Sequence, residues 1–139
     1  MRRAWTVVLA GAVAASAAPA AGASNTTLTR TLARGVAQLR TFHDPHELEP
    51  RLARTLARLR QDEGSTARGR KARVLAVRGF TWTLRGVRAQ LDLLVNDSGN
   101  VEAATRDAKR ADGNLDNGAH LLRRAARLLG LRLGRLNGH

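Results

Sequence analysis

The sequence predicts an all-α protein: a four-helix bundle in which two short helices pack on a long antiparallel helical hairpin. Two observations support this fold class. Apolar residues recur at spacings of three and four along the chain, and no stretch alternates with the period of two that is typical of a strand. Clusters of glycine, proline, aspartate and asparagine interrupt this pattern and divide the chain into two short and two long helical segments.

The first two predicted helices are short and follow one another directly. The apolar positions of the first, over about 26–42, are Leu28, Leu32, Val36 and Leu39. Asp44 is expected to cap the second helix, and Pro45 suits its first position because the missing N–H has no helical partner there. Leucines at spacings of three and four extend this helix to about residue 61. A glycine stop and a serine cap, Ser65, are expected next.

The third and fourth predicted helices form a hairpin roughly 45 Å long at the usual rise per residue. The third covers about 66–96. Its apolar stripe consists of Val77, Phe80, Leu84, Val87, Leu91 and Leu94. After a short polar break, the fourth helix continues the same alternation of spacings from Val101 to Leu129. Leu75 and Trp82 lie off the main stripe, and we expect them to pack beneath the first two helices.

The fourth predicted helix contains a segment, DGNLDNGAH at 112–120, that is rich in poor helix formers. Its first residues match the opening of a calcium-binding EF-hand loop, but Asn117 replaces the required glycine and Arg123 replaces the bidentate glutamate. Because the 3,4 register passes through the segment without a slip, the sequence favours a continuous helix over a turn. We expect that helix to bend, fray or be interrupted near 113–118, as a hinge or a close-packing point.

The N-terminal residues have the organisation of a cleavable signal peptide. A short basic start is followed by an apolar segment from Trp5, and small residues precede a cleavage site after Ala23. An uncleaved membrane anchor is the alternative, but the segment is rich in alanine and poor in strongly apolar residues. We therefore expect 1–23 to be removed and 24–139 to fold as one helical-bundle domain that is secreted or located in the periplasm or cell envelope.

The composition argues against cysteine chemistry and favours anionic partners. With no cysteine, the chain has no disulfide, no thiolate nucleophile and no cysteine-ligated metal. Lysine and arginine number 24 against 11 acidic residues, a formal net charge of +13. Such a charge favours an anionic polymer, an anionic membrane surface or an acidic protein as partner. Nucleic acid is disfavoured, because the chain has no tyrosine and few other rings to stack on bases.

Basic residues form the most specific surface pattern, and they lie on the two long helices. Lys71, Arg78 and Arg85 recur every seven residues and share one helix face, which Arg88 extends. Near the C-terminus, 120–136 is strongly amphipathic, with leucines on one side and arginines on the other. This segment either lies on an anionic membrane or packs its leucines into the bundle. The residues expected to bind an anionic partner are Lys71, Arg78, Arg85, Arg88, Arg123, Arg124 and Arg127.

Histidine and acidic clusters are too sparse to predict a metal, a cofactor or a catalytic site. Asp112, Asp116 and His120 share one face of the fourth helix, but the facing helix offers mainly arginines. His43 and His46 flank residues that are already explained as a helix start. The serines of the mature chain lie at its terminus or at expected helix starts, where capping accounts for them. No enzyme is predicted, and no cofactor or metal is expected.

These patterns predict an exported, non-catalytic, arginine-rich helical protein that binds anionic partners at or outside the cell envelope. A structural or self-assembling subunit is the first alternative. In that case the alanine-rich seam of the fourth helix and the leucine-rich C-terminus would bury against other copies in a homo-oligomer. An enzyme with an unrecognised site is the second alternative.

Overall fold

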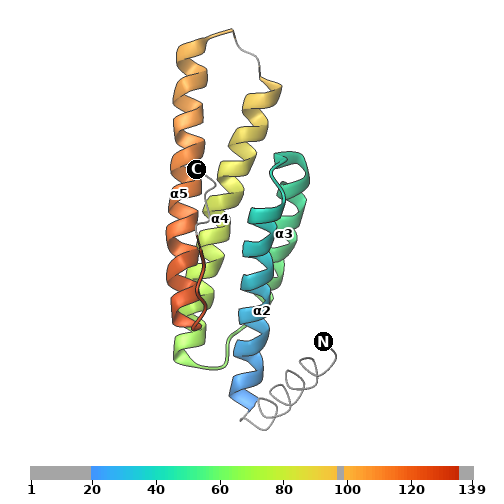
Figure 1. The fold of residues 1–139 in the computed structure, drawn as a ribbon, viewed down its shortest axis with the longest axis vertical. Helices are drawn as coiled ribbons and strands as arrows, with labels where there is room; N and C mark the ends of the chain where they lie inside the picture. The colour runs from blue at the N-terminus through green and yellow to red at the C-terminus, as the bar shows by residue number, and fades with distance from the viewer. Residues whose placement is uncertain (1–19, 97–98, 135–139) are drawn as a thin grey trace, which may run out of the picture.

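The structure is a computed structural model that describes residues 20–96 and 99–134. Within these residues the chain forms four α-helices and no strand. They are α2 (Ala20–Thr41), α3 (Pro45–Gln61), α4 (Ala67–Val95) and α5 (Val101–Leu128). The helices pack as a bundle, with the most extensive contact between α4 and α5 (Figure 1). The predicted fold, two short helices packed on a long antiparallel hairpin, is confirmed.

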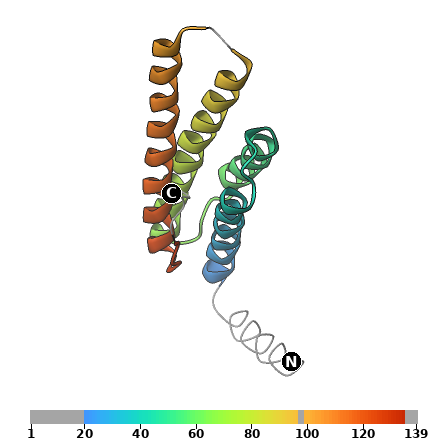
Figure 2. The same cartoon turned by 45° about the horizontal axis from the view of Figure 1, so that its top comes forward.

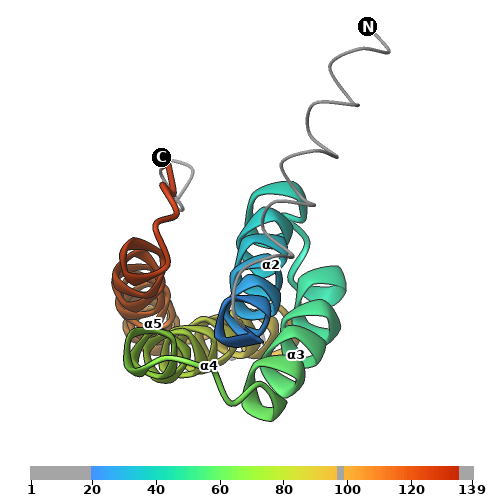
Figure 3. The same ribbon diagram turned by 90° about the horizontal axis from the view of Figure 1, so that it is seen from below.

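The two short helices cover only part of the hairpin. Figure 2 shows α2 and α3 beside the part of α4 that follows the α3–α4 loop, whereas the α4–α5 loop extends beyond them. We call residues 67–88 and 109–128 the base of the hairpin, and residues 89–108 its tip. Seen from below in Figure 3, α2 and α3 lie to one side of the α4–α5 pair. No other described helix packs on the opposite side, which we call the open face.

Side chains cap the starts of α3 and α4. The Asp44 carboxylate accepts a hydrogen bond of 2.9 Å from the backbone N–H two residues later, as the sequence predicted. For α4 the cap is Thr66, whose hydroxyl accepts from the Gly69 N–H at 3.0 Å. The prediction of Ser65 is therefore wrong by one residue. The Ser65 hydroxyl instead donates to the Asn25 side chain at 3.2 Å and ties the loop to α2.

Helix α5 ends earlier than the amphipathic pattern of 120–136 predicted. Gly130 adopts a φ of 73°, a left-handed conformation that favours glycine. Its N–H donates to the Arg127 carbonyl at 3.2 Å, and the Leu131 N–H donates to the Ala126 carbonyl at 2.8 Å. This pair of bonds is a Schellman motif, which stops a helix. The prediction of a helix beyond Leu128 is wrong for residues 131–134, which are not helical, and 135–136 lie outside the described residues.

The predicted signal peptide lies largely outside the described residues. Of its 23 positions, only 20–23 are described, and they form the first turn of α2. That helix therefore begins about six residues before the expected start at 26, and removal of 1–23 stays a prediction. Among the described residues, no helix combines the length and apolar character needed to cross a membrane.

The hydrophobic core fills the space between α4, the two short helices and the second half of α5. Phe80 of α4 is its largest fully buried side chain. Gly35 of α2 faces this ring, and a Cβ at Gly35 would lie 2.5 Å from Phe80 Cζ and 2.7 Å from Thr55 Cγ2 of α3. A side chain at position 35 would collide with this ring, so glycine allows α2 to pack directly against Phe80. The other large, fully buried side chains are Leu28, Leu32, Leu52, Leu59, Leu122, Val36 and Val87.

Small residues bring α4 and α5 close together at the base. The buried small residues of α4 include Ala72, Ala76, Gly79, Thr83 and Gly86. Gly118 of α5 packs among them: a Cβ there would lie 2.8 Å from the Gly79 carbonyl oxygen and 2.9 Å from the Thr83 amide nitrogen. Ala111, Ala119, Ala125 and Ala126 of α5 are also buried. The small residues of the base are thus buried within one chain, whereas Ala104 and Ala108, in the first half of α5, are exposed and half-buried.

The DGNLDNGAH segment is a close-packing point. Helix α5 passes through 112–120 as continuous α-helix, which confirms the continuous helix that the register favoured. Of the bend, fraying or interruption expected near 113–118, the interruption is absent. Gly118 is buried against α4, whereas a Cβ at Gly113 would meet nothing within 4 Å. Tertiary packing of one face stabilises a helix whose own propensity is weak, which explains why the segment stays helical.

The apolar pattern continues into the tip of the hairpin, but the apolar side chains there are exposed. Leu94 and Val101 are 65% and 80% exposed. Both belong to the apolar repeat of the sequence, but α2 and α3 do not extend to this level and so do not cover them (Figure 1). The ion pair between Glu49 of α3 and Arg88 of α4, at 2.8 Å, lies where the N-terminal part of α3 meets the hairpin.

Candidate anion-binding site

A basic cavity of about 250 Å³ opens between α4 and α5 at the base of the hairpin. We call it the base pocket. Its described lining residues are Arg68, Lys71, Leu75, Arg124, Arg127 and Leu128. Four of these six are cationic and none is acidic. The pocket therefore combines a small apolar floor with several positive charges that no carboxylate in its lining offsets.

Local sequence explains why these cations converge. Arg68 and Lys71 are three residues apart in the first turns of α4 and so lie on one side of the helix. Because α5 runs antiparallel, its last turns lie beside the first turns of α4, which places Arg124 and Arg127 opposite them. The first turn of α4 contains no acidic residue. The positive end of the α4 dipole lies here beside the negative end of the α5 dipole, so the positive charge of the site comes from its side chains.

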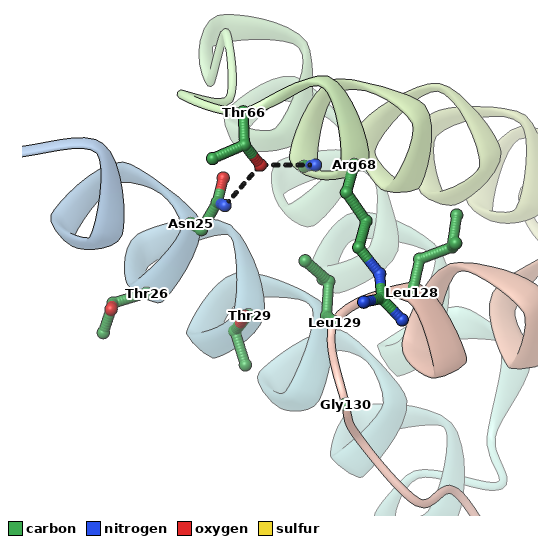
Figure 4. A pocket seen from close by; sticks show the side chains of 9 residues that line it. Asn25, Thr26, Thr29, Thr66, Arg68, Leu128, Leu129 and Gly130 are labelled. Atoms are coloured by element: carbon green, nitrogen blue, oxygen red, sulfur yellow. Dashed lines mark hydrogen bonds between the residues drawn. The ribbon is translucent and has the colours of Figure 1, made fainter.

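A second cavity, of about 430 Å³, adjoins the base pocket. Figure 4 shows its lining, to which α2 contributes Asn25, Thr26 and Thr29 and the end of α5 contributes Leu128 to Gly130. The Asn25 amide donates to the Thr66 hydroxyl at 2.8 Å and holds α2 against the start of α4. Arg68 lines both cavities and extends from α4 toward the end of α5. The cationic pocket thus continues into a wall of hydroxyl and amide groups.

The structure brings three of the predicted binding residues together and separates the others. Lys71, Arg124 and Arg127 line the base pocket. The predicted residues outside its lining are Arg78, Arg85, Arg88 and Arg123. Arg78 is exposed on α4 and Arg123 is half-buried on α5. Arg88 bonds to the Glu49 carboxylate, so its charge is already partly offset.

Sequence reasoning missed Arg68 and misplaced Trp82. Arg68 precedes Lys71 by three residues, a spacing that could have included it in the basic stripe. Trp82 is half-buried, and the guanidinium carbon of Arg85 lies 5.2 Å from its ring centroid. The prediction that it packs beneath the first two helices is wrong, because Phe80, two residues away and on the other side of α4, takes that place. Leu75 is buried and lines the base pocket.

The leucines of the C-terminal region face the bundle. Leu122 is fully buried. Five others pack against the core while keeping part of their surface exposed: Leu121, Leu128, Leu129, Leu131 and Leu133. Of the two interpretations of 120–136, the structure favours inward packing for the part that it describes. The apolar surface that a membrane-bound helix needs is largely used inside the molecule.

Charge is distributed unevenly along the hairpin. Four of the 11 acidic residues lie in the tip, which has one basic residue, whereas the base has two acidic and 12 basic residues. At the tip, a cavity of about 430 Å³ has Asp92 and Asp107 in its lining, with Arg110 beside them. The base is therefore strongly cationic and the tip is locally acidic.

The histidine and acidic clusters of the sequence remain separate surface features. Asp112, Asp116 and His120 are exposed on α5. His43 and His46 are exposed beside Asp44, whose carboxylate caps α3. In the part of the chain that the structure describes, no group of three or more His, Cys, Asp or Glu side chains is placed to hold a metal ion.

Comparison with known proteins adds no family assignment: no protein-family model, no curated protein and no solved structure matches this chain.

Proposed function

We propose that this protein is an exported, non-catalytic helical protein that binds an extended anionic polymer at or outside the cell envelope through the base pocket. The observation that supports this proposal most strongly is the convergence of Arg68, Lys71, Arg124 and Arg127 around one cavity without an acidic lining residue. Clustered cations of one sign raise the local concentration of anionic ligands and strengthen their binding.

A polymer fits the site better than a membrane surface does. The leucines of the C-terminal region pack against the core, which leaves little apolar area to enter a bilayer beside the arginines. The cations instead continue along α4 as a row, because Arg78 and Arg85 follow Lys71 at intervals of seven residues. At 1.5 Å per residue the row is about 21 Å long, so several charged units of one extended chain can contact it together.

Binding to immobilised heparin tests this proposal. The variant with Lys71→Gln, Arg124→Gln and Arg127→Gln should elute at a clearly lower salt concentration than the wild type. The matched control is Arg30→Gln, Arg34→Gln and Arg58→Gln, which removes the same charge from exposed positions of α2 and α3. If both variants elute equally early, binding depends on net charge alone and the base pocket has no special role.

Export is tested separately from binding. Expression of the full chain with its own N-terminus in a bacterial host, followed by N-terminal sequencing of the exported product, should show Ser24 as the first residue. Retention of the intact chain inside the cell would contradict the export part of the proposal without affecting the anion-binding part.

A further inference from the structure

The open face of the hairpin has a regular pattern on both helices. On α4 a stripe with alternating spacings of four and three extends from Lys71 to Asn96, and on α5 a second such stripe extends from Ala103 to Leu128. Residues at these spacings share one side of a helix. The cavities agree with this placement, because each is lined by residues of both stripes, one cavity at the base and one at the tip. The open face therefore has a cationic end and an acidic end.

The two stripes have their midpoints at the same height. Gly86 of α4 approaches the Ala111 carbonyl of α5, and Gly79 approaches the Leu122 backbone. The middle of the α4 stripe, between Trp82 and Arg85, therefore lies beside the middle of the α5 stripe. A two-fold axis that lies parallel to the open face, perpendicular to the helices and at this height, places the base of one copy over the tip of another.

We propose that a second copy of this chain docks on the open face in antiparallel orientation, with its acidic tip over the base pocket. In this arrangement α4 lies over α4 and α5 lies over α5, each pair running in opposite directions. Such a two-fold contact is self-complementary, so every favourable pair occurs twice. The proposal goes beyond anion binding because the occupant of the pocket is part of the protein itself.

Charge complementarity selects the antiparallel orientation. By position in the stripes, Asp107 faces Arg124 of the partner subunit, and Arg110 faces the partner subunit's Leu121. On α4, Arg85 faces Trp82 of the partner subunit, a contact that suits a guanidinium and an indole ring. No charged residue of either stripe lies directly opposite one of the same sign.

The parallel alternative lacks this complementarity. Rotation about the long axis of the hairpin would place α4 over α5 of the partner subunit, base over base and tip over tip. Asp92 would then face the partner subunit's Asp107, and the two base pockets would repel each other. Like charges placed opposite one another strongly disfavour an interface.

The size and polarity of the open face indicate a weak, reversible dimer. The stripes cover 25 residue steps, about 37 Å, and two packed helices are roughly 18 Å wide. The buried area is therefore on the order of 600 Å² per copy, below that of a stable standard interface. Because charge pairs contribute much of the specificity, association should weaken as salt rises. A polyanion bound in the base pocket should compete with the second copy.

Sedimentation velocity of the wild type and three charge variants tests the proposal. At low ionic strength and high protein concentration, the weight-average mass of the wild type should rise toward twice that of one chain and fall again with added salt. Asp107→Arg and Arg124→Asp should each weaken association at least about tenfold, because each places like charges opposite one another twice per dimer. The double variant Asp107→Arg with Arg124→Asp restores both pairs and should return association to near the wild-type value.

The matched control is Asp112→Arg, which makes the same charge change at an exposed position of α5 outside the stripe. It should leave association close to that of the wild type. A wild type that stays monomeric at every salt concentration overturns the proposal. Stronger association of Asp107→Arg alone would indicate the parallel orientation and overturn it as well. These readouts require no polyanion, so failure of the heparin experiment leaves them unaffected.

Discussion

The base and the tip of the α4–α5 hairpin have the same repeat of residue spacings but very different environments. At the base, Phe80 and Leu122 are fully buried, and glycines bring the two helices into backbone contact. At the tip, Leu94 and Val101 are mostly exposed. The base is cationic, while the tip is acidic. A heptad pattern therefore identifies which side of a helix can be buried, whereas the neighbouring helices decide whether that side is buried.

At the base, α4 is covered by α2 and α3, through residues that are distant from it in the sequence. Gly35 of α2 and Thr55 of α3 meet Phe80 of α4, so three helices share this part of the core. Nothing equivalent reaches the tip in the described residues. Stability should therefore be concentrated at the base, while the tip is left for contact with other molecules.

The largest contrast is expected for leucine truncation at the two ends. Leu122→Ala removes a fully buried side chain at the base and should lower the free energy of unfolding by about 2–5 kcal/mol. Leu94→Ala removes one that is 65% exposed at the tip and should change it by about 0.5 kcal/mol or less. Urea denaturation followed by circular dichroism measures both. Equal losses would show that the tip is buried in solution.

A smaller contrast is expected for two glycines of the DGNLDNGAH segment. Gly118→Ala would force a Cβ toward the backbone of α4 and should destabilise the protein by about 1–3 kcal/mol. Gly113→Ala has open space around it and should stabilise the helix by up to about 1 kcal/mol. The same denaturation experiment compares the two variants. Stabilisation by both would contradict close packing at Gly118.

The smallest effect is expected where α3 meets the hairpin, at the ion pair of Glu49 with Arg88. The Arg88 side chain is 58% exposed, so solvent screens the pair and its contribution should be about 0.5 kcal/mol or less. Glu49→Gln should therefore barely change the denaturation midpoint. A loss comparable to that of Leu122→Ala would mean that this pair, rather than the apolar core, holds α3 on α4.

Local patterns predicted the helices because helix starts, stops and apolar spacings are encoded by neighbouring residues. Asp44 as a cap and the end of α3 near residue 61 follow directly from such signals. The end of α5 was missed because the left-handed turn at Gly130 interrupts a segment whose leucines keep a helical spacing. The exposure of Leu94 was missed because it depends on where α2 and α3 end in space.

Local patterns in the sequence also predicted part of the candidate site. The heptad spacing identified Lys71, and the amphipathic C-terminal region identified Arg124 and Arg127. That these residues meet in one pocket depends on the register of the hairpin, which the Gly79 and Gly118 contacts set and which spacing alone does not reveal. The orientation of Trp82 likewise depends on the side of α4 on which α2 packs.

The central claim is that the two ends of the open face differ in what they bind. Chemical-shift mapping of the isotope-labelled protein with a short heparin oligosaccharide tests it most directly. We expect the perturbed amides to cluster at the base, around Arg68, Lys71, Arg124 and Arg127. Those around Asp92 and Asp107 at the tip should change little. Perturbations spread evenly over the exposed arginines of α2 and α3, or centred on the tip, would contradict it.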